Sequence, residues 1–500
     1  MQACCFKTLL LNLIIPVGIG AIILLIVGTP LVIFSARKYF RKKKAAVVDQ
    51  DVKTVGFFHP FCNTGGGGER VLWCAIRSMQ LRYPKVKIVV YTGDLDASPE
   101  EIMGRVHQRL NIHLPNPVEF VYLRWRRWVE PEMYPYFTLL GQSLGSVILG
   151  LEALIAFLPD LYIDTMGYAF TLPLFKYVGL CETACYTHYP TITGDMLRRV
   201  SSRVTAHNNR RIVARSPFLT AAKIIYYKIF AWMYAHVGRC ADAIMVNSSW
   251  TEEHINSLWN CPFKTHRVYP PCDVEDLKTL VRPEDEEDKD ALALVTRDGI
   301  KDVQKQKLFK IISVAQYRPE KDHPLQLRAM YQLRQIIPEE LWDRVRLIFV
   351  GSCRNADDEK RVQDMQDLCK HLSLEENVVF KVNVPYAELR QDLQEGVIGL
   401  HAMWNEHFGI GVVECMAAGL IMVAHRSGGP RMDIVEEAEA SRTGFLATDE
   451  AEYAQAIAAI LTMSPGARRK IQEAARASVD RFSVAEFESN FLRVVDPFMR

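Results

Sequence analysis

The stretch that decides the fold reads NEHFGIGVVECMAAG and spans Asn405–Gly419. An apolar, strand-like run at 397–401 precedes it, and helical spacing of apolar residues begins at Ile410. Two carboxylates, Glu406 and Glu414, are separated by seven residues and flank glycines that let a ligand approach the backbone. We expect both to meet one ligand at the carboxyl end of a parallel sheet. There a helix N-terminus suits phosphate and carboxylates suit sugar hydroxyls.

Apolar runs rich in Val, Ile, Tyr and Phe alternate with helical stretches on both sides of this motif. A first series comprises 53–59, 87–92, 119–123, 161–164, 183–188 and 243–247, and a second comprises 308–315, 346–351, 378–382, 397–401 and 420–425. Such alternation predicts βαβ units with parallel sheets. We therefore expect an α/β protein with an N-terminal domain at 53–275, an acidic connection at 276–306 and a C-terminal domain at 307–475. A C-terminal helix at 476–500 is expected to pack back on the first domain.

Composition and charge exclude several classes of protein. The chain has 500 residues, 49% of them hydrophobic and 24% charged, which excludes a disordered or collagen-like chain. The net charge of +2 gives no reason to expect a nucleic-acid partner. It divides unevenly, with +6 on residues 1–50 and −4 on the remainder. The twelve cysteines follow no regular framework, which indicates reduced thiols.

The basic leader is also apolar. Residues 8–35 carry no charge and as a helix would be about 42 Å long, enough to cross a bilayer. Six cations at 37–44 follow this run, whereas a cleaved signal peptide carries its charges before a shorter apolar core. We predict a retained transmembrane anchor at 8–35, a basic linker at 36–52 and a catalytic body in the cytosol. Two further apolar stretches, 135–159 and 218–237, could each be a second span, but polar or charged residues interrupt both, so buried helices or in-plane membrane contacts are the other two interpretations.

Two loops of the expected N-terminal domain have the composition of ligand-binding loops. Gly65–Gly68 lies between a strand and a helix, and its free backbone suits contact with an anion or a sugar. No Gly-Lys-Ser/Thr follows, so it is not a P-loop. The Asp94-Leu95-Asp96 sequence could bind a metal, but it lies in a loop far along the chain from the expected cations. We expect a solvated loop there and no metal.

The 405–419 segment resembles the E-x₇-E signature of retaining glycosyltransferases of family 4. Further segments resemble elements of that family, namely Val268–Asp273, Ser427–Pro430 and Thr443–Leu446. The resemblance implies a GT-B fold, in which two Rossmann-like domains face each other, and it implies a metal-independent reaction.

The resemblance also implies roles for residues of the second domain. Glu414 is expected to hold the donor ribose, and Lys321 the diphosphate. Gln316 occupies the family's arginine position, so Arg318, two residues later, is the candidate for the second cation. The donor mannose and phosphate are expected to meet Glu406 and the backbone of Phe408, Gly409 and Ile410.

In the first domain His188 ends a strand, at a position where the family uses a histidine toward the donor. The expected catalytic residues are thus Glu406, His188 and Lys321. The glycine loop is expected to serve both substrates, through Gly65 and Gly66 on the donor side and Gly67 and Gly68 on the acceptor side. Asp164 is a further candidate on the acceptor side.

Four runs, at 65–73, 137–145, 168–177 and 404–419, are most similar to the eukaryotic GDP-mannose-dependent α-1,2-mannosyltransferases of the asparagine-linked glycosylation pathway. The resemblance implies that GDP-mannose is the donor and a dolichol-diphosphate oligosaccharide the acceptor of its fourth and fifth mannoses. It places the enzyme on the cytosolic face of the endoplasmic reticulum membrane, with other mannosyltransferases of the pathway as partners. Two alternatives are a same-fold enzyme with another donor or acceptor and a non-catalytic membrane-anchored scaffold.

Overall fold

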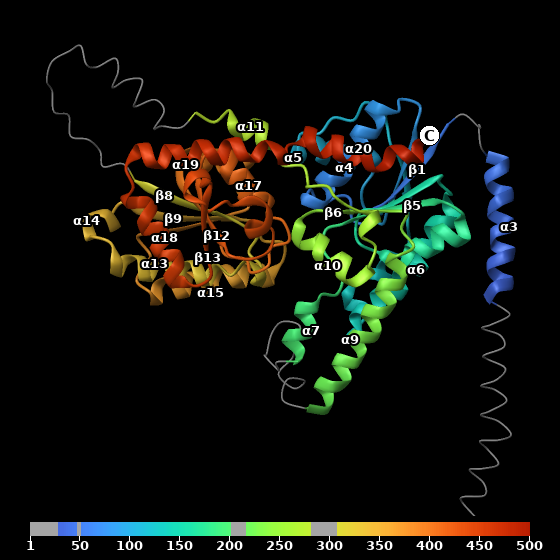
Figure 1. The fold of residues 1–500 in the computed structure, drawn as a ribbon, viewed down its shortest axis with the longest axis horizontal. Helices are drawn as coiled ribbons and strands as arrows, with labels where there is room; N and C mark the ends of the chain where they lie inside the picture. Colours follow the sequence, from blue (N-terminus) through green and yellow to red (C-terminus); the bar gives the residue numbers. More distant parts are fainter. Residues whose placement is uncertain (1–28, 48–51, 202–216, 282–307) are drawn as a thin grey trace, which may run out of the picture. The chain divides into compact units, whose positions relative to one another are not determined.

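The computed structural model of the chain describes residues 29–47, 52–201, 217–281 and 308–500. The chain divides into two compact α/β units (Figure 1). Unit 1 takes the described residues up to Met245, together with His254–His266 and Leu492–Arg500. Unit 2 consists of Val246–Glu253 and Arg267–Phe491.

The sheet of unit 1 has seven strands in the order β3-β2-β1-β4-β5-β6-β7. These are β1 (Thr54–Phe58), β2 (Lys87–Thr92), β3 (Glu119–Tyr122), β4 (Leu161–Asp164), β5 (Glu182–Thr187), β6 (Ala243–Val246) and β7 (Thr265–Arg267). β1 pairs in parallel with both β2 and β4, so the strand order reverses between β1 and β4. The first six strands lie where the apolar runs predict them, whereas β7 is too short and polar for such a pattern.

The longer helices built around the strands of unit 1 are α3 (Thr29–Val47), α4 (Gly67–Arg82), α5 (Pro99–Leu110), α6 (Thr138–Ala156), α7 (Gly194–Ser201) and α9 (Pro217–Gly238). α10 (Ser249–Trp259) begins in unit 2 and ends in unit 1. Much of the predicted basic linker is therefore helical, because residues 36–47 belong to α3. The predicted anchor lies outside the described residues up to residue 28, and its last part, 29–35, opens α3.

Unit 2 has a six-stranded, wholly parallel sheet in the order β10-β9-β8-β11-β12-β13. The strands are β8 (Phe309–Val314), β9 (Val345–Gly351), β10 (Val378–Val382), β11 (Gly396–His401), β12 (Ile421–His425) and β13 (Gly444–Ala447). Every residue of β11 and β12 is buried, which explains their continuous apolar runs. This order also reverses once, between β8 and β11.

Helices cover both faces of this sheet. One apolar cluster joins the strands to α13 (His323–Ile336), α15 (Ala356–His371) and α18 (Glu450–Thr462). The other joins them to α11 (Val274–Lys278), α17 (Ile410–Ala417) and α19 (Pro465–Ser478). The remaining helices are α14 (Glu339–Trp342), α16 (Tyr386–Glu395) and α20 (Val484–Met499). The last part of α20, from Leu492, belongs to unit 1. There the Tyr83 hydroxyl donates a hydrogen bond to Asp496 at 2.5 Å.

Candidate active site

The candidate site of unit 2 is built at the point where the strand order reverses. The loop after β8 carries Arg318 and Lys321, and β11 ends at His401, five residues before Glu406. β8 and β11 are hydrogen-bonded neighbours, so both segments leave the same edge of the sheet side by side. Open parallel sheets bind ligands at such a reversal point, because the loops diverge there and leave a crevice.

Glu406 lies between two cationic or hydrogen-donating side chains at this edge. Its Oε2 atom is ion-paired with Lys321 Nζ and lies 3.2 Å from His401 Nε2. Burial alone would raise the pKa of the Glu406 carboxyl, but the Lys321 charge and the His401 hydrogen bond outweigh it and hold that pKa well below its usual range. The carboxylate is therefore ionised, while its Oε1 accepts no hydrogen bond from any described residue.

The loop that carries Glu406 is held by a second loop, Ser427–Gly429. The Gly429 amide donates to the Glu406 carbonyl at 2.7 Å, and the Asn405 amide donates to Ser427 Oγ at 2.7 Å. A side chain at Gly428 would place its Cβ 2.2 Å from the Glu406 carbonyl oxygen. Glycine is thus required at Gly428 for this close approach, and the two loops fix the backbone of Glu406.

The other expected donor residues of the motif open α17. Gly409 precedes the helix with φ +111°, a conformation that favours glycine, and Phe408 is buried beside it. The Val412 and Val413 amides donate to the Gly409 carbonyl, so the amides of Ile410 and Gly411, at the very start of the helix, are the ones that can bind an anion. Glu414 lies one turn along α17, half-buried, and its charge helps to raise the pKa of the Tyr386 phenol, after burial and two nearby aspartates.

Arg318 lies in the turn after β8 and is partly buried. Burial and the neighbouring charge of Arg354 lower the pKa of its guanidinium. Its Nε atom is buried and has no hydrogen-bond partner among the described residues, and the nearest carboxylate oxygen, on Glu320, is 3.9 Å away. An incompletely neutralised guanidinium with a cationic neighbour suits an anionic group such as a diphosphate.

In unit 1 the glycine loop is tied to a carboxylate of its own helix. Glu69 accepts hydrogen bonds from the amides of Thr64, Gly65 and Gly66 at 3.0, 3.2 and 2.7 Å. The amides of Gly65 and Gly66, expected on the donor side, are therefore already occupied by Glu69 in this structure. Only Gly67 and Gly68, which open α4, keep amides outside this arrangement.

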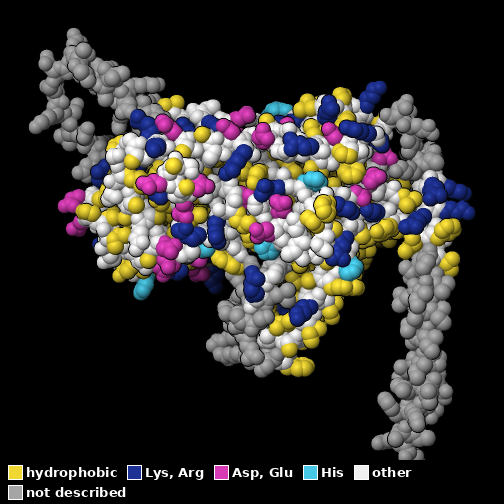
Figure 2. Space-filling model, in the orientation of Figure 1, with side chains coloured by type: hydrophobic (Ala, Val, Ile, Leu, Met, Phe, Trp, Pro, Cys, Tyr) yellow, Lys and Arg dark blue, Asp and Glu magenta, His cyan; other side chains and the backbone are white. Residues whose placement is uncertain are grey.

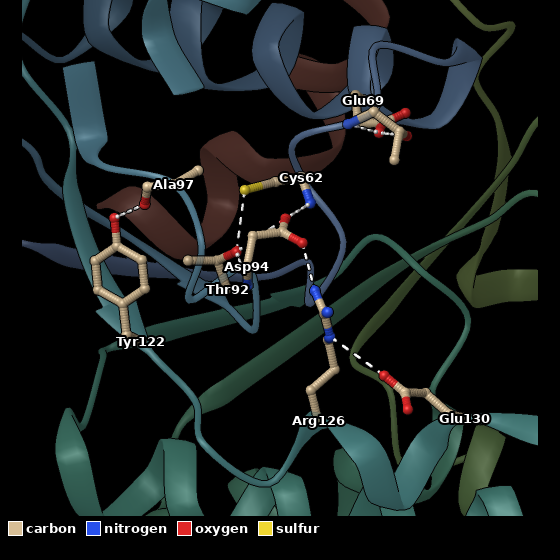
Figure 3. A network of polar contacts seen from close by, with 9 residues as sticks. Cys62, Glu69, Thr92, Asp94, Ala97, Tyr122, Arg126 and Glu130 are labelled. Atoms are coloured by element: carbon tan, nitrogen blue, oxygen red, sulfur yellow. Dashed lines mark hydrogen bonds and ion pairs between the residues drawn. The ribbon is translucent and has the colours of Figure 1, made fainter. Parts of the chain in front are cut away.

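The expectation of a solvated loop at Asp94 is wrong. Asp94 is buried, accepts a hydrogen bond from the Cys62 amide at 2.8 Å and forms an ion pair with Arg126 (Figure 3). Arg126 also reaches Glu130 at 3.5 Å. Asp94 can be buried because Arg126, a cation from a distant 3₁₀ segment, neutralises it. Asp96 is exposed, as expected. In the part of the chain that the structure describes, no three His, Cys, Asp or Glu side chains gather as metal ligands would.

His188 belongs to a hydrogen-bonded chain that the sequence did not reveal. Its Nε2 lies 3.1 Å from the Thr165 carbonyl oxygen, and Thr165 Oγ1 lies 2.8 Å from Nδ1 of His59. His59 is fully buried, and burial with the nearby His188 lowers its pKa to about 3. A Cβ at Gly68 would lie 3.7 Å from His188 Nε2, so the structure brings the glycine loop and this imidazole together.

Asp164 ends β4, at the reversal point of the first sheet. Its Oδ1 accepts a hydrogen bond from the Met166 amide at 3.0 Å, which holds the turn after the strand. Burial raises the pKa of its carboxyl to about 7, although backbone amides of the turn oppose this. Its Oδ2 is buried without a partner among the described residues. Asp164 thus holds the turn through one oxygen and has a second, buried oxygen that no described residue satisfies.

Comparisons with known proteins agree with this architecture. The family described as ALG11 mannosyltransferase N-terminus matches residues 52–259, and the family described as Glycosyl transferases group 1 matches residues 297–478. A glycosyltransferase from Rickettsia africae has a similar structure, with a TM-score of 0.57 and 13% identity, over 90% of this chain and 99% of its own. This likeness concerns the fold, which is the GT-B fold.

Two curated relatives carry the same printed name, GDP-Man:Man(3)GlcNAc(2)-PP-Dol alpha-1,2-mannosyltransferase. The protein from Xenopus laevis is 48% identical over 100% of this chain and 99% of its own length. The protein from Homo sapiens is 50% identical over 92% of this chain and 90% of its own. The chain therefore belongs to the family of the GDP-Man:Man(3)GlcNAc(2)-PP-Dol alpha-1,2-mannosyltransferases.

Proposed function

We propose that this chain transfers mannose from GDP-mannose, with α-1,2 linkage, to a Man(3)GlcNAc(2) oligosaccharide on dolichol diphosphate. These would be the fourth and fifth mannoses of that acceptor. The relatives' shared name supports the substrates, since identity to them extends over almost the whole chain. The observation that carries the proposal is the ionised Glu406, whose Oε2 is occupied by Lys321 and His401 while Oε1 is available to a sugar.

The donor roles follow from charge. Lys321 and Arg318 are the cations of this edge, and the diphosphate gains negative charge as the bond to mannose breaks. Lys321 would therefore pass from Glu406 to the diphosphate. Glu414 would hold the ribose hydroxyls, and the first amides of α17, near Phe408, Gly409 and Ile410, would meet phosphate.

We infer a front-face substitution that retains the α configuration. The acceptor oxygen bonds to the anomeric carbon on the face from which the phosphate oxygen departs, and its proton passes to that phosphate oxygen. An ionised Glu406 stabilises positive charge that develops on the sugar ring, without attacking it. His188, on the donor side, and Gly67, Gly68 and Asp164, on the acceptor side, keep the roles that the family resemblance implies. Gly65 and Gly66 would meet the donor by close approach of their backbone and not through their amides, which Glu69 occupies.

Kinetics of two glutamate variants test these roles. Glu406→Ala should abolish transfer, because it removes the group that stabilises the transition state. Glu414→Ala should mainly raise the KM for GDP-mannose, because a ribose contact is made equally in the ground and transition states. An unchanged KM for GDP-mannose in Glu414→Ala would contradict the ribose role.

The substrate's lipid anchor calls for a membrane-bound enzyme, and unit 1 has a surface that suits this. On α6, four exposed apolar side chains share one stripe, Leu144, Ile148, Leu151 and Ile155. On α9, a similar exposed stripe comprises Phe218, Ile225, Ile229 and Trp232 (Figure 2). Both stripes are spaced by three, four or seven residues, so each occupies one helix face.

The two helices are neighbours, because the Tyr226 hydroxyl accepts a hydrogen bond from the Leu140 amide at 3.1 Å. Of the described helices, α6 is the one long and apolar enough to span a membrane, but Ser146, Leu149 and Ala153 are buried within unit 1. We propose that both stripes lie in the cytosolic surface of the endoplasmic reticulum membrane, beside the single anchor at 8–35. Other mannosyltransferases of the pathway remain proposed partners.

A further inference from the structure

His401 is a buried imidazole that no motif in the sequence marks. Its side chain is 8% exposed, and its backbone carbonyl accepts a hydrogen bond from the Tyr453 hydroxyl at 2.8 Å. Its Nε2 lies 3.2 Å from Glu406 Oε2, and its Nδ1 is buried with no hydrogen-bond partner among the described side chains and backbone groups. The contact with Glu406 is thus the one described hydrogen bond of this ring.

The direction of that hydrogen bond follows from the charge of Glu406. An ionised carboxylate only accepts, so Nε2 of His401 carries the hydrogen and donates it. Lys321 donates to the same oxygen. Oε2 is thus held from two sides, and the carboxylate is turned so that Oε1 remains for a ligand.

These two donors are not equivalent once the substrate binds. In the proposed function Lys321 is also the cation for the donor diphosphate, and an ammonium that turns to a phosphate no longer fully neutralises Glu406. We propose that His401 is a positioning residue that keeps Glu406 oriented and ionised when Lys321 turns to the donor. This inference rests on the proposed function and adds the group on which Glu406 then depends.

Neighbouring titratable groups do not offer the same contact. His323, from α13, packs its ring against Tyr317 at 5.3 Å and has no hydrogen bond to a described residue. His425, from β12, contacts Ser427 Oγ at 2.8 Å through Nδ1. The described titratable groups that interact with His401 are these two histidines, Lys321, Glu406 and the Tyr453 phenol, and of the three histidines His401 contacts the carboxylate.

A pair of near-isosteric variants separates donation from packing. His401→Gln keeps an N–H donor at about the reach of Nε2, whereas His401→Met has similar shape and no donor. We expect His401→Met to lower kcat about 10- to 100-fold with the KM for GDP-mannose changed less than about threefold, since the contact matters most in the transition state. His401→Gln should recover most of the loss. His323→Met, the same change at the neighbouring buried histidine, should keep kcat within about threefold.

Each outcome has a defined meaning. A kcat in His401→Met equal to that of the wild type would overturn the positioning role. Equal losses of kcat in His401→Gln and His401→Met, with unchanged melting temperatures, would overturn it too. A loss confined to the KM for GDP-mannose would also overturn it. If His401→Met does not fold, His401→Asn replaces it, since its amide is too short to reach Glu406. Absence of mannose transfer by the wild type would instead contradict the proposed function.

Discussion

Replacing Lys321 by methionine tests both of its contacts in one variant. The Lys321–Glu406 pair is mostly buried, with 21% and 14% of the two side chains exposed. Removing one partner of a fully buried pair costs about 3–5 kcal/mol, because the other charge is left uncompensated. Since His401 still donates to the same oxygen, we expect a smaller cost, about 2 kcal/mol. For a unit of this size the melting temperature of unit 2 should fall by about 4–8 °C.

Adding Glu406→Gln to Lys321→Met should restore the thermal stability but not the affinity for GDP-mannose. In the Lys321→Met/Glu406→Gln double variant the stranded charge is gone, so most of the lost thermal stability should return. GDP-mannose affinity should stay about 10- to 100-fold below the wild type in both variants, because the diphosphate has lost a charged donor. Calorimetric melting of the full chain in detergent and titration with GDP-mannose measure the two quantities separately.

The matched control is Lys381→Met. Lys381 forms a similarly buried ion pair in the same unit, with its Nζ 2.8 Å from Oδ2 of the buried Asp392. Its loss should lower the melting temperature without changing the affinity for GDP-mannose. Two results would refute the reasoning, namely a Lys321→Met variant as stable as the wild type, or one that binds GDP-mannose as tightly.

Three further predictions concern other parts of the molecule. Burial lowers the pKa of His323 to about 4. Between that pH and about 6.5 this residue is therefore protonated in the unfolded chain but not in the folded one. Its contribution to the free energy of unfolding falls by about 1.4 kcal/mol for each unit by which the pH is lowered. His323→Met should flatten this dependence in a melting series from pH 6.5 to 4.5, and an unchanged slope would contradict it. Arg126→Met should destabilise unit 1 by several degrees by stranding Asp94, and Asp94→Asn added to it should restore the melting temperature. Ile229→Ser/Trp232→Ser should reduce co-sedimentation with vesicles yet leave melting within about 2 °C, since both side chains are exposed; undiminished binding would argue against the membrane surface.

What the sequence could predict was local. Strand, glycine turn and helix follow one another within 397–419, so the periodicity and glycines of that stretch suffice to place Glu406 at a sheet edge. The contact of Lys321 with Glu406 joins residues 85 apart. It depends on β8 lying next to β11, a pairing that spacing along the chain does not reveal.

The residues that sequence reasoning missed are ordinary in their local context. A single histidine at a strand end, such as His401 or His59, has the same pattern as one packed in a core. Asp94 looked solvated because its cation, Arg126, comes from a distant 3₁₀ segment. The role of Glu69 did have a signal, because an acid three residues after Gly66 is the spacing of a helix cap.

The most direct test uses the purified full chain, radiolabelled GDP-mannose and a Man(3)GlcNAc(2) acceptor on a dolichol-like diphosphate. We predict that two labelled mannoses are added in α-1,2 linkage, releasable by an α-1,2-specific mannosidase, and that Glu406→Ala adds none. Failure of the wild-type chain to transfer label from GDP-mannose, or transfer by Glu406→Ala at the wild-type rate, would contradict the assignment of this edge of unit 2 as the catalytic centre.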